Sequence, residues 1–239
     1  MKHSKKKRKG NREVVIILGP PGSGKGTQGE LLAEKFNLYY LETSKILEAQ
    51  FEKAKKSQSV KIKGKSYRIL DEKKLWQDGI LCSPPFVSYL IKRKIEELFK
   101  EGKNLLLSGS PRTLPEAKEV TPLLKRLYGL KNIKVVLLDI SAKESIFRNS
   151  HRRICQLMRH PILYSKETAK LKKCPLDGSK LMKRKGLDNP ETIKVRLKEY
   201  KERTWPLIGY FKKEGLKVKK INGSPPPAVV FKSILRALK

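Results

Sequence analysis

A glycine-rich stretch near the start of the chain contains the residues with the clearest chemical potential. Residues 19–27 read GPPGSGKGT and bring several glycines together with Lys25 and the hydroxyl of Thr27. Glycines let backbone N–H groups turn inward around phosphate oxygens, and a lysine and a hydroxyl can then meet the outer phosphates and a magnesium ion. An ordinary turn between a strand and a helix does not need these residue types together. The stretch therefore predicts a site for a nucleoside triphosphate with magnesium.

The flanking elements are those that such a loop requires. The apolar run at 14–18 breaks abruptly at the first glycine, and residues 28–36 have helical character. A strand, a glycine loop and a helix in this order form a phosphate loop, because the helix N-terminus adds partial positive charge behind the backbone N–H groups. The general pattern places Ser or Thr directly after the lysine. Here Gly26 takes that place and Thr27 follows it.

The rest of the chain alternates short apolar runs with helical patterns. Further strands are predicted at 38–41, 104–108, 134–139 and 217–221, with helices between them. Because strands that alternate with helices form parallel sheets covered on both faces, we expect a three-layer α/β/α fold with a parallel five-stranded sheet. The lysine- and serine-rich residues 55–65 predict a mobile connection.

Composition bounds the class of protein. The 239 residues include 56 Lys+Arg against 23 Asp+Glu, a formal net charge of +33, and 38% hydrophobic residues. This length suits one or two domains with a sizeable core. The charge excess favours contact with nucleic acid or another anionic surface, the alternative being a solvated lysine-rich exterior. Residues 1–12 concentrate this charge, and such a run predicts a disordered basic tail.

Cysteine content and hydropathy favour the cytoplasm. The three cysteines, Cys82, Cys155 and Cys174, are too few and too far apart for a disulfide framework. Such usage is typical of a reducing compartment. No apolar run approaches the roughly 18 residues that cross a bilayer, so no membrane contact is expected. We expect a cytoplasmic monomer.

Several motifs resemble the adenylate kinase family of nucleoside-monophosphate kinases, over residues 13–239. The glycine loop matches the family through ten residues, GPPGSGKGTQ. SGSPRTLPEA at 108–117 resembles the family's DGFPRT-x-P-Q-A segment. RNSHRR at 148–153 resembles the arginine pattern at the entry of the family's lid. DNPET at 188–192, followed by Arg196, resembles the exit from that lid.

The resemblance implies one kinase domain over 13–239 with two mobile flaps. The first, at about 42–82, grips the acceptor nucleotide, and we name it the acceptor segment. The second, the family's lid, lies at about 151–188, and we name it the lid segment. The implied reaction is ATP + AMP ⇌ 2 ADP, with magnesium bound to ATP and to Thr27. A kinase for GMP or another monophosphate, and a weakly active homologue that binds RNA or the ribosome, stay open as alternatives.

The resemblance also assigns residues to the two nucleotides. The implied ATP-binding residues come from the loop and the lid entry: Gly22, Ser23, Gly24, Lys25, Gly26, Thr27, Arg148, Arg152 and Arg153. The implied acceptor residues are Thr43, Lys45, Leu81, Cys82, Gly109, Arg112, Glu116 and Arg196. Phosphoryl transfer needs positioning and charge neutralisation rather than a nucleophile. The implied catalytic residues are therefore Lys25, Arg112, Arg152 and Arg196. Either Arg184 or Lys185 matches a further lid arginine.

The acceptor half departs from the family pattern at Glu48, where the family has an arginine that helps hold the acceptor phosphate. Lys45 lies three residues earlier and shares a helix face with it. We hypothesise that Lys45 takes over part of the clamp and that Glu48 steadies it. The alternative is that both are surface residues and that Arg112 works alone.

Two further departures concern the base and the metal. Glu116 replaces a glutamine that reads adenine, and a carboxylate can only accept hydrogen bonds, which suits guanine better. Strong AMP preference would then rest on backbone contacts near Leu81 and Cys82, or on a protonated Glu116. Ser108 replaces an aspartate that orients the water shell of magnesium, so we expect a less firmly held ion.

The lid segment contains a partial metal motif, Cys155-x-x-Met158 and Cys174-x-x-Asp177. Some relatives bind zinc there through paired C-x-x-C, the last position sometimes being aspartate. Cys155, Cys174 and Asp177 could therefore serve, but methionine is a poor zinc ligand. His160 could replace it only with a shift. We expect a lid held by packing, with free cysteines, rather than by zinc.

Overall fold

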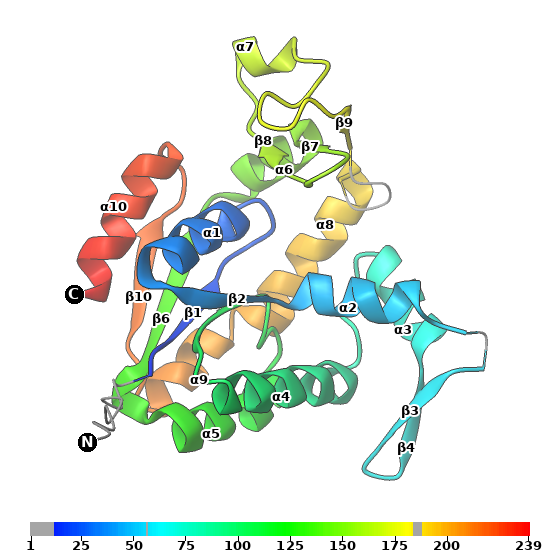
Figure 1. Ribbon diagram of the computed structural model, residues 1–239, viewed down its shortest axis with the longest axis vertical. Helices are drawn as coiled ribbons and strands as arrows, with labels where there is room; N and C mark the ends of the chain where they lie inside the picture. Colours follow the sequence, from blue (N-terminus) through cyan, green and yellow to red (C-terminus); the bar gives the residue numbers. More distant parts are fainter. Residues whose placement is uncertain (1–11, 56, 184–187) are drawn as a thin grey trace, which may run out of the picture.

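A parallel sheet forms the centre of the computed structural model, which describes residues 12–55, 57–183 and 188–239. Its five strands run in the order β10-β6-β1-β5-β2, and every neighbouring pair is parallel (Figure 1). The strands are β1 (Val14–Leu18), β2 (Leu38–Glu42), β5 (Asn104–Ser108), β6 (Ile133–Asp139) and β10 (Val218–Asn222). This sheet confirms the predicted fold class.

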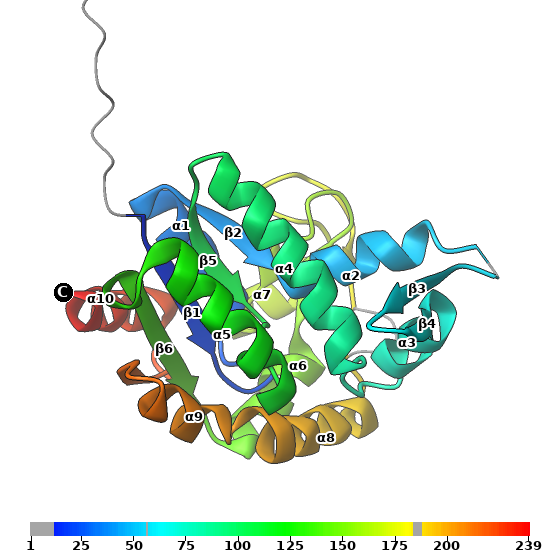
Figure 2. The ribbon, with the colours of Figure 1, turned by 90° about the horizontal axis from the view of Figure 1, so that it is seen from below.

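Helices cover both faces of the sheet, as Figure 2 shows. The layers are α1 (Lys25–Phe36) with α10 (Pro227–Leu238), and α4 (Pro84–Lys100) with α5 (Leu114–Tyr128) and α9 (Leu207–Lys213). Val15 and Ile17 of β1 pack into the first layer's apolar cluster, and Val14 and Ile16 into the second. Alternate side chains of a strand point to opposite faces, so a strand buried on both faces needs the continuous apolar run seen in β1.

The acceptor segment contains a β-hairpin that the sequence did not predict. Its elements are α2 (Thr43–Glu52), β3 (Ser59–Ile62), β4 (Lys65–Arg68) and α3 (Ile69–Gln77), and β3 pairs with β4 antiparallel. The expectation of a mobile connection over 55–65 is therefore wrong for β3. Val60, Ile62 and Tyr67 pack against the main apolar cluster, which gives the hairpin a buried face despite its many lysines.

The hairpin is anchored to the core through Glu119 of α5. Lys63 Nζ, at the hairpin turn, lies 2.7 Å from Glu119 Oε1, and Lys92 Nζ of α4 lies 2.8 Å from Glu119 Oε2. Hydrogen bonds from Lys63 and Lys92 favour the charged carboxylate and lower the pKa of Glu119 to about 2. The acceptor segment is thus tied to α4 and α5 by a charged network.

Acid is expected to release this anchor. The folded-state pKa of Glu119 lies below the ordinary value of 4.5, so its stabilisation is present above that pH and is lost as the pH falls towards 2. Because Lys63 is 79% exposed and Lys92 and Glu119 are 35% and 37% exposed, we expect Glu119→Gln to lower the free energy of unfolding by about 1 kcal/mol or less at neutral pH. Urea titrations of both proteins at neutral pH and near the folded-state pKa measure this. An equal difference at both pH values would contradict the prediction.

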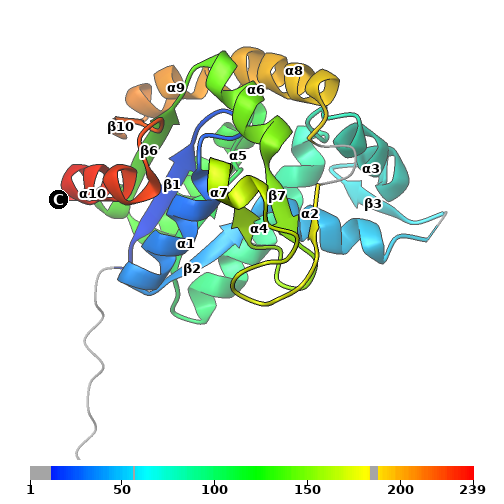
Figure 3. The same cartoon turned by 90° about the horizontal axis from the view of Figure 1, so that it is seen from above.

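The lid segment forms a small sheet of its own, at one end of the molecule (Figures 1 and 3). Its described elements are β7 (Arg153–Cys155), β8 (Pro161–Ile162), α7 (Lys166–Ala169) and β9 (Leu181–Met182), with strand order β8-β7-β9. The elements that join it to the core are α6 (Ala142–His151), α8 (Pro190–Glu199) and the π-helix η2 (Tyr200–Thr204), while the 3-10 helix η1 (Leu130–Asn132) precedes β6. A local apolar cluster of Cys155, Ile162 and Cys174 holds the lid segment together.

Arg12 was predicted to belong to the basic tail, but its guanidinium donates to the Phe99 carbonyl at 2.6 Å and covers the Phe99 ring. The rest of the tail, and the candidates Arg184 and Lys185, lie outside the described residues. Among the helices of the described part of the chain, none is both long enough and apolar enough to cross a bilayer.

Candidate functional site

A cleft of about 520 Å³ opens beyond the carboxyl ends of β1 and β5, between the acceptor segment and the lid segment. Ligands of parallel α/β sheets bind in this position. The predicted site residues that line it are Gly22, Ser23, Gly24, Lys25, Gly26, Thr27, Leu81, Gly109, Arg112, Arg148, Arg152 and Arg196. The predicted residues that do not line it are Thr43, Lys45, Cys82, Glu116 and Arg153. The structure thus brings together all the predicted ATP-binding residues except Arg153, but only some of the predicted acceptor residues.

The glycine loop wraps around the start of α1, which begins at Lys25. Gly22 and Gly24 have φ values of 76° and 92°, a left-handed backbone that glycine adopts without strain. The ammonium group of Lys25 donates to the carbonyls of Gly19 and Pro20, at 2.8 Å each. The loop therefore combines left-handed glycines, a helix N-terminus and a held cation, the features from which phosphate sites are built.

Helix α6 supports the loop from behind. Ser145 Oγ donates to the Pro21 carbonyl at 2.6 Å, and both Ser145 and Asn149 are fully buried. A Cβ at Gly22 would lie 2.5 Å from Asn149 Nδ2, so a larger residue at position 22 would collide with α6. The position of the loop is therefore fixed by packing, and not by its own sequence alone.

The three arginines at the entry of the lid segment take different positions. Arg148 donates to the carbonyls of Gly223 and Ser224 at 3.0 and 2.8 Å, and so joins α6 to the turn after β10. Arg152 lines the cleft and pairs with the buried carboxylate of Asp188. Arg153 donates to carbonyls inside the lid segment and does not reach the cleft, contrary to the predicted contact with ATP.

Arg112 lies in the acceptor half of the cleft and depends on a glycine. Gly109 has φ +87°, and a Cβ there would lie 2.5 Å from Arg112 Nη2. Thr204 Oγ1 donates to the Arg112 carbonyl at 2.8 Å and fixes the backbone of the loop. The guanidinium is therefore positioned by close packing, and its planar donors suit phosphate oxygens.

Glu116 is turned away from the cleft. Only 2% of its surface is exposed, and its carboxylate accepts hydrogen bonds from Ser110 Oγ, Thr113 Oγ1 and the backbone N–H of Arg112. Burial raises the pKa of Glu116, and the hydrogen bonds oppose that shift. The predicted contact with the acceptor base is therefore wrong in this structure. Glu116 and Thr113 instead cap the start of α5 and shape the loop that carries Arg112.

Lys45 and Glu48 do not form the predicted pair. Lys45 is 69% exposed and lies 3.5 Å from Glu42, outside the cleft. Glu48 lines the cleft and lies 3.6 Å from Arg159 of the lid segment. Lys45 is drawn away from Glu48 because its Nζ lies over the ring of Tyr40, near the N-terminal end of α2.

Two other predicted acceptor residues serve the core. Thr43 is buried and its hydroxyl donates to the Ser108 carbonyl, which ties α2 to β5. Cys82 is buried, its thiol donates to the Glu72 carbonyl, and burial raises its pKa to about 12. Leu81 lines the cleft, and its backbone N–H donates to Glu199 Oε2 at 3.0 Å.

Several cleft residues were missed from the sequence. They include Trp76, Phe147, Tyr164, Glu199 and Tyr200. One signal was available, because Glu199 follows Arg196 by three residues and so shares a helix face with it. The aromatic residues carried no signal, because a lone aromatic side chain is more often part of a core.

Four possible metal ligands meet inside the lid segment. One ligand atom from each of Cys155, His160, Cys174 and Asp177 lies within 4.8 Å of the others. Thiols, imidazole and carboxylate are the ligands that zinc prefers. The expectation that His160 needs a shift is wrong, since its ring nitrogen lies 3.5 Å from Asp177 and 3.8 Å from the Cys174 sulfur. Met158, the residue suggested by spacing, is 63% exposed.

Comparison with known proteins places these observations in a family. A family model described as "Adenylate kinase" matches residues 17–216. A protein of Methanothrix thermoacetophila named "Adenylate kinase" is 35% identical, over 94% of this chain and 97% of its own length. Proteins of the same name from Petrotoga mobilis and Chlamydia trachomatis are each 32% identical over 94% of this chain, and over 97% and 89% of their own lengths. The resemblance seen in the sequence is confirmed.

Proposed function

Because the chain belongs to the adenylate kinase family of phosphotransferases, we propose that it transfers the γ-phosphoryl group of ATP to AMP and so forms two ADP. One observation carries the proposal: the glycine loop with Lys25 and the arginine Arg112 line a single cleft. Phosphoryl transfer requires donor and acceptor in line, in a place where positive charge offsets the negative charge of the transition state. A cleft with a triphosphate loop on one side and a fixed guanidinium on the other meets this need.

In the donor half, the loop N–H groups and Lys25 bind the ATP phosphates. Arg148 of α6, which is bonded to the turn after β10, borders the position of the donor base, and Arg152 meets the phosphates from the lid side. Magnesium bound with ATP would supply positive charge that offsets the charge of the phosphates. The hydroxyl of Thr27 would hold it. Ser108, at the end of β5, offers a hydroxyl where a carboxylate would orient the ion more firmly.

In the acceptor half, Arg112 binds the phosphate of AMP, and Arg196 meets the phosphoryl group during transfer. Gly109 and Leu81 line the same half of the cleft, where their backbone groups can contact the nucleotide. Because Glu116 is directed into the protein, its carboxylate is not placed to select guanine. Membership of a family whose relatives are named "Adenylate kinase" supports AMP as the acceptor.

The acceptor and lid segments close over the two nucleotides in this proposal and exclude water, which would otherwise accept the phosphoryl group. The protein acts as a cytoplasmic monomer. The three cysteines support a reducing compartment, since none of them forms a disulfide.

A panel of acceptors tests the proposed function. ADP formation from magnesium ATP is measured with AMP, GMP, CMP and UMP at equal concentrations. The proposal expects AMP to react fastest, by at least about tenfold in kcat/KM. A faster reaction with GMP, or no reaction with any of the four, would overturn it.

The lid segment fits a structural zinc ion, held by Cys155, His160, Cys174 and Asp177. Zinc in such a set is four-coordinate and stabilises the fold without entering the reaction. The ligand atoms lie together in the described structure, so binding requires little rearrangement. The zinc would fix the turn that joins β7 to β8.

Metal analysis with two matched variants tests this site. We expect the purified protein to carry about one zinc ion per chain, since the four ligands make one tetrahedral site. His160→Ala should weaken zinc binding by more than the roughly 10- to 100-fold that follows loss of an outer contact. Met158→Leu changes the residue that spacing suggested, and should leave binding and Tm unchanged. Equal zinc content in both variants would contradict the assignment.

A further inference from the structure

We propose that Glu48 and Arg159 form a charge link between the acceptor segment and the lid segment, and that this link positions the two segments for phosphoryl transfer. The proposal rests on the proposed function for its kinetic consequence only. Its structural consequence holds for the free protein. Glu48 is thus a positioning residue that acts through Arg159.

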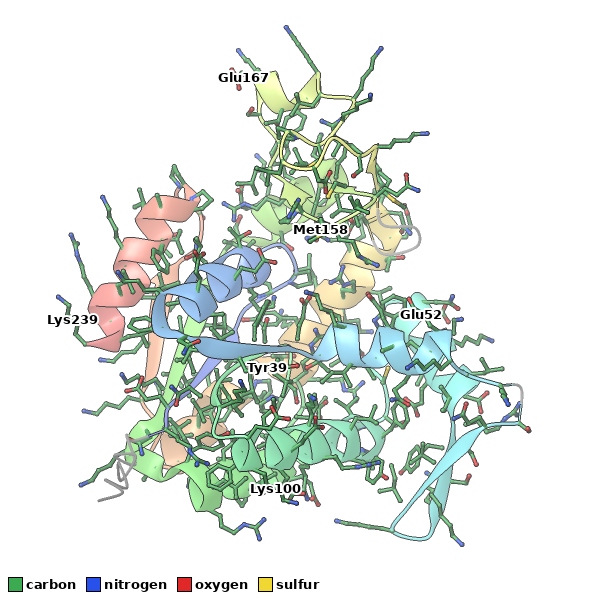
Figure 4. The ribbon with its side chains drawn as sticks, viewed as in Figure 1. Tyr39, Glu52, Lys100, Met158, Glu167 and Lys239 are labelled. Atoms are coloured by element: carbon green, nitrogen blue, oxygen red, sulfur yellow. The ribbon has the colours of Figure 1, made fainter. Side chains whose placement is uncertain are left out.

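The two side chains come from opposite sides of the cleft. Glu48 stands on α2, which is held on the core by the buried side chains of Leu47 and Phe51. Arg159 lies in the turn between β7 and β8, and Figure 4 labels its neighbour Met158 at the end of the lid segment nearest α1 and α2. The guanidinium Nη1 lies 3.6 Å from Glu48 Oε2. An ion pair therefore spans two segments that otherwise belong to different parts of the fold.

The backbone at Arg159 makes this position unusual. Its φ is +59°, in the left-handed region where glycine is the ordinary residue and an arginine carries some strain. The turn is fixed by its neighbours, because the His160 N–H donates to Cys155 Sγ and the Cys155 N–H donates to the His160 carbonyl. The arginine is thus held on a rigid turn and presented towards α2.

The charges nearby belong to both segments and to α1. Lys45 and Glu42 pair at the start of α2, and Glu30 of α1 lies within the electrostatic range of both and of His160. The end of the lid segment thus faces a mixed group of charges. Among the contacts between the described parts of the two segments, the Glu48–Arg159 pair joins side chains of opposite charge directly.

The position of Glu48 gives the pair its role. Glu48 lines the cleft, where an anionic acceptor is proposed to bind, and a carboxylate there repels a phosphate. Arg159 neutralises that carboxylate when the lid segment meets the acceptor segment. Closure therefore removes a repulsion as well as forming a contact, and so favours acceptor binding.

The size of the effect is modest. Arg159 is 55% exposed and Glu48 22% exposed, and pairs of this kind contribute about 0.2 to 1 kcal/mol. That range corresponds to a change of up to about fivefold in a population or binding constant, at 1.36 kcal/mol per tenfold. The experiment must resolve such a change.

Distances between two dyes in the free protein test the link. The dyes replace Glu52 at the end of α2 and Glu167 in the lid segment, both labelled in Figure 4, through non-natural residues that spare the cysteines. We expect Glu48→Gln and Arg159→Gln each to lower the closed population by about two- to fivefold. The double variant should be no more open than Glu48→Gln alone. Unchanged single variants, or additive effects in the double variant, would overturn the proposal.

Exchanging the two charges of the pair tests whether their attraction causes the closure. Glu48→Arg with Arg159→Glu should restore the closed population that each reversal alone removes. Arg68→Gln serves as the control, because Arg68 is similarly exposed, 63%, and pairs with Asp71 inside the acceptor segment. It should leave the distance unchanged, and a shift as large as that of Arg159→Gln would contradict the link.

Kinetics distinguish this proposal from the proposed function. Arg159→Gln leaves the Glu48 carboxylate without that partner, so it should raise KM for AMP by about two- to fivefold and leave kcat equal or higher, since opening limits many such enzymes. Glu48→Gln removes the repelling charge together with the pair, so it should raise KM for AMP by less than Arg159→Gln does. The dye distances need no catalysis. A protein without kinase activity but with the expected distances would overturn the proposed function and retain the link, and the reverse result would overturn the link alone.

Discussion

Lys25→Met is expected to lower kcat by about 10²- to 10³-fold, the loss that follows removal of one preorganised charge from a transition state. Methionine keeps an unbranched, flexible side chain of similar shape, one atom shorter, and removes the ammonium group. That group is held by the Gly19 and Pro20 carbonyls at the mouth of the loop, so the variant loses charge at a fixed place. The backbone N–H groups still bind phosphate, and KM for ATP should change much less than kcat.

The measurement is steady-state ADP formation with AMP saturating and ATP varied. Unfolding by urea provides the control for structure, because Lys25 is only half-buried and the variant should keep its fold. A loss of less than about tenfold in kcat would mean that Lys25 does not act on the transferred group.

Arg112→Lys should lower kcat/KM for AMP by about 10²- to 10³-fold, even though the positive charge is kept. A guanidinium binds two phosphate oxygens with parallel hydrogen bonds, whereas an ammonium group is a single point charge. The space at Gly109 is matched to the guanidinium, so a lysine would leave that contact empty. KM for ATP should stay within about threefold of the original value.

Arg126→Lys is the matched control for this substitution. Arg126 stands on α5, is 70% exposed and pairs with Glu96 on the protein surface. Its replacement should leave both KM values unchanged. If Arg112→Lys and Arg126→Lys behaved alike, Arg112 would not be the acceptor clamp.

The sequence was most informative where one short stretch contains all the elements of the predicted phosphate loop. The strand at 14–18, the glycine loop and the helix after it are consecutive, so their spacing alone defines the arrangement. The structure confirms the parallel sheet around them. Such local order depends on propensity and hydrophobic period, which a single sequence displays.

The acceptor half could not be predicted as well, because it is assembled from distant residues. Glu116 satisfies its carboxylate within its own loop, and Glu48 finds a partner more than a hundred residues away, in Arg159. Spacing from a family motif places such residues in order along the chain. It does not tell which polar partner each side chain will meet.

The hairpin was missed, and His160 was expected to need a shift, for related reasons. In β3 and β4 the alternation that marks a strand is carried by only three apolar side chains among lysines and serines. His160 joins the thiols because a tight turn after β7 brings it back, although C-x-x-C spacing pointed to Met158. The conformation of a turn decides which side chains meet, and the number of residues between two cysteines does not reveal that conformation.

Transfer between two distinguishable nucleotides tests the central claim most directly. The protein is mixed with magnesium, unlabelled ATP and AMP that carries ¹³C in its base, and the products are weighed by mass spectrometry. A kinase that moves the γ-phosphoryl group to AMP must form labelled and unlabelled ADP in equal amounts at early times, and Lys25→Met must form far less of both. Unlabelled ADP with free phosphate, and labelled AMP left unchanged, would show hydrolysis instead and would contradict the proposed function.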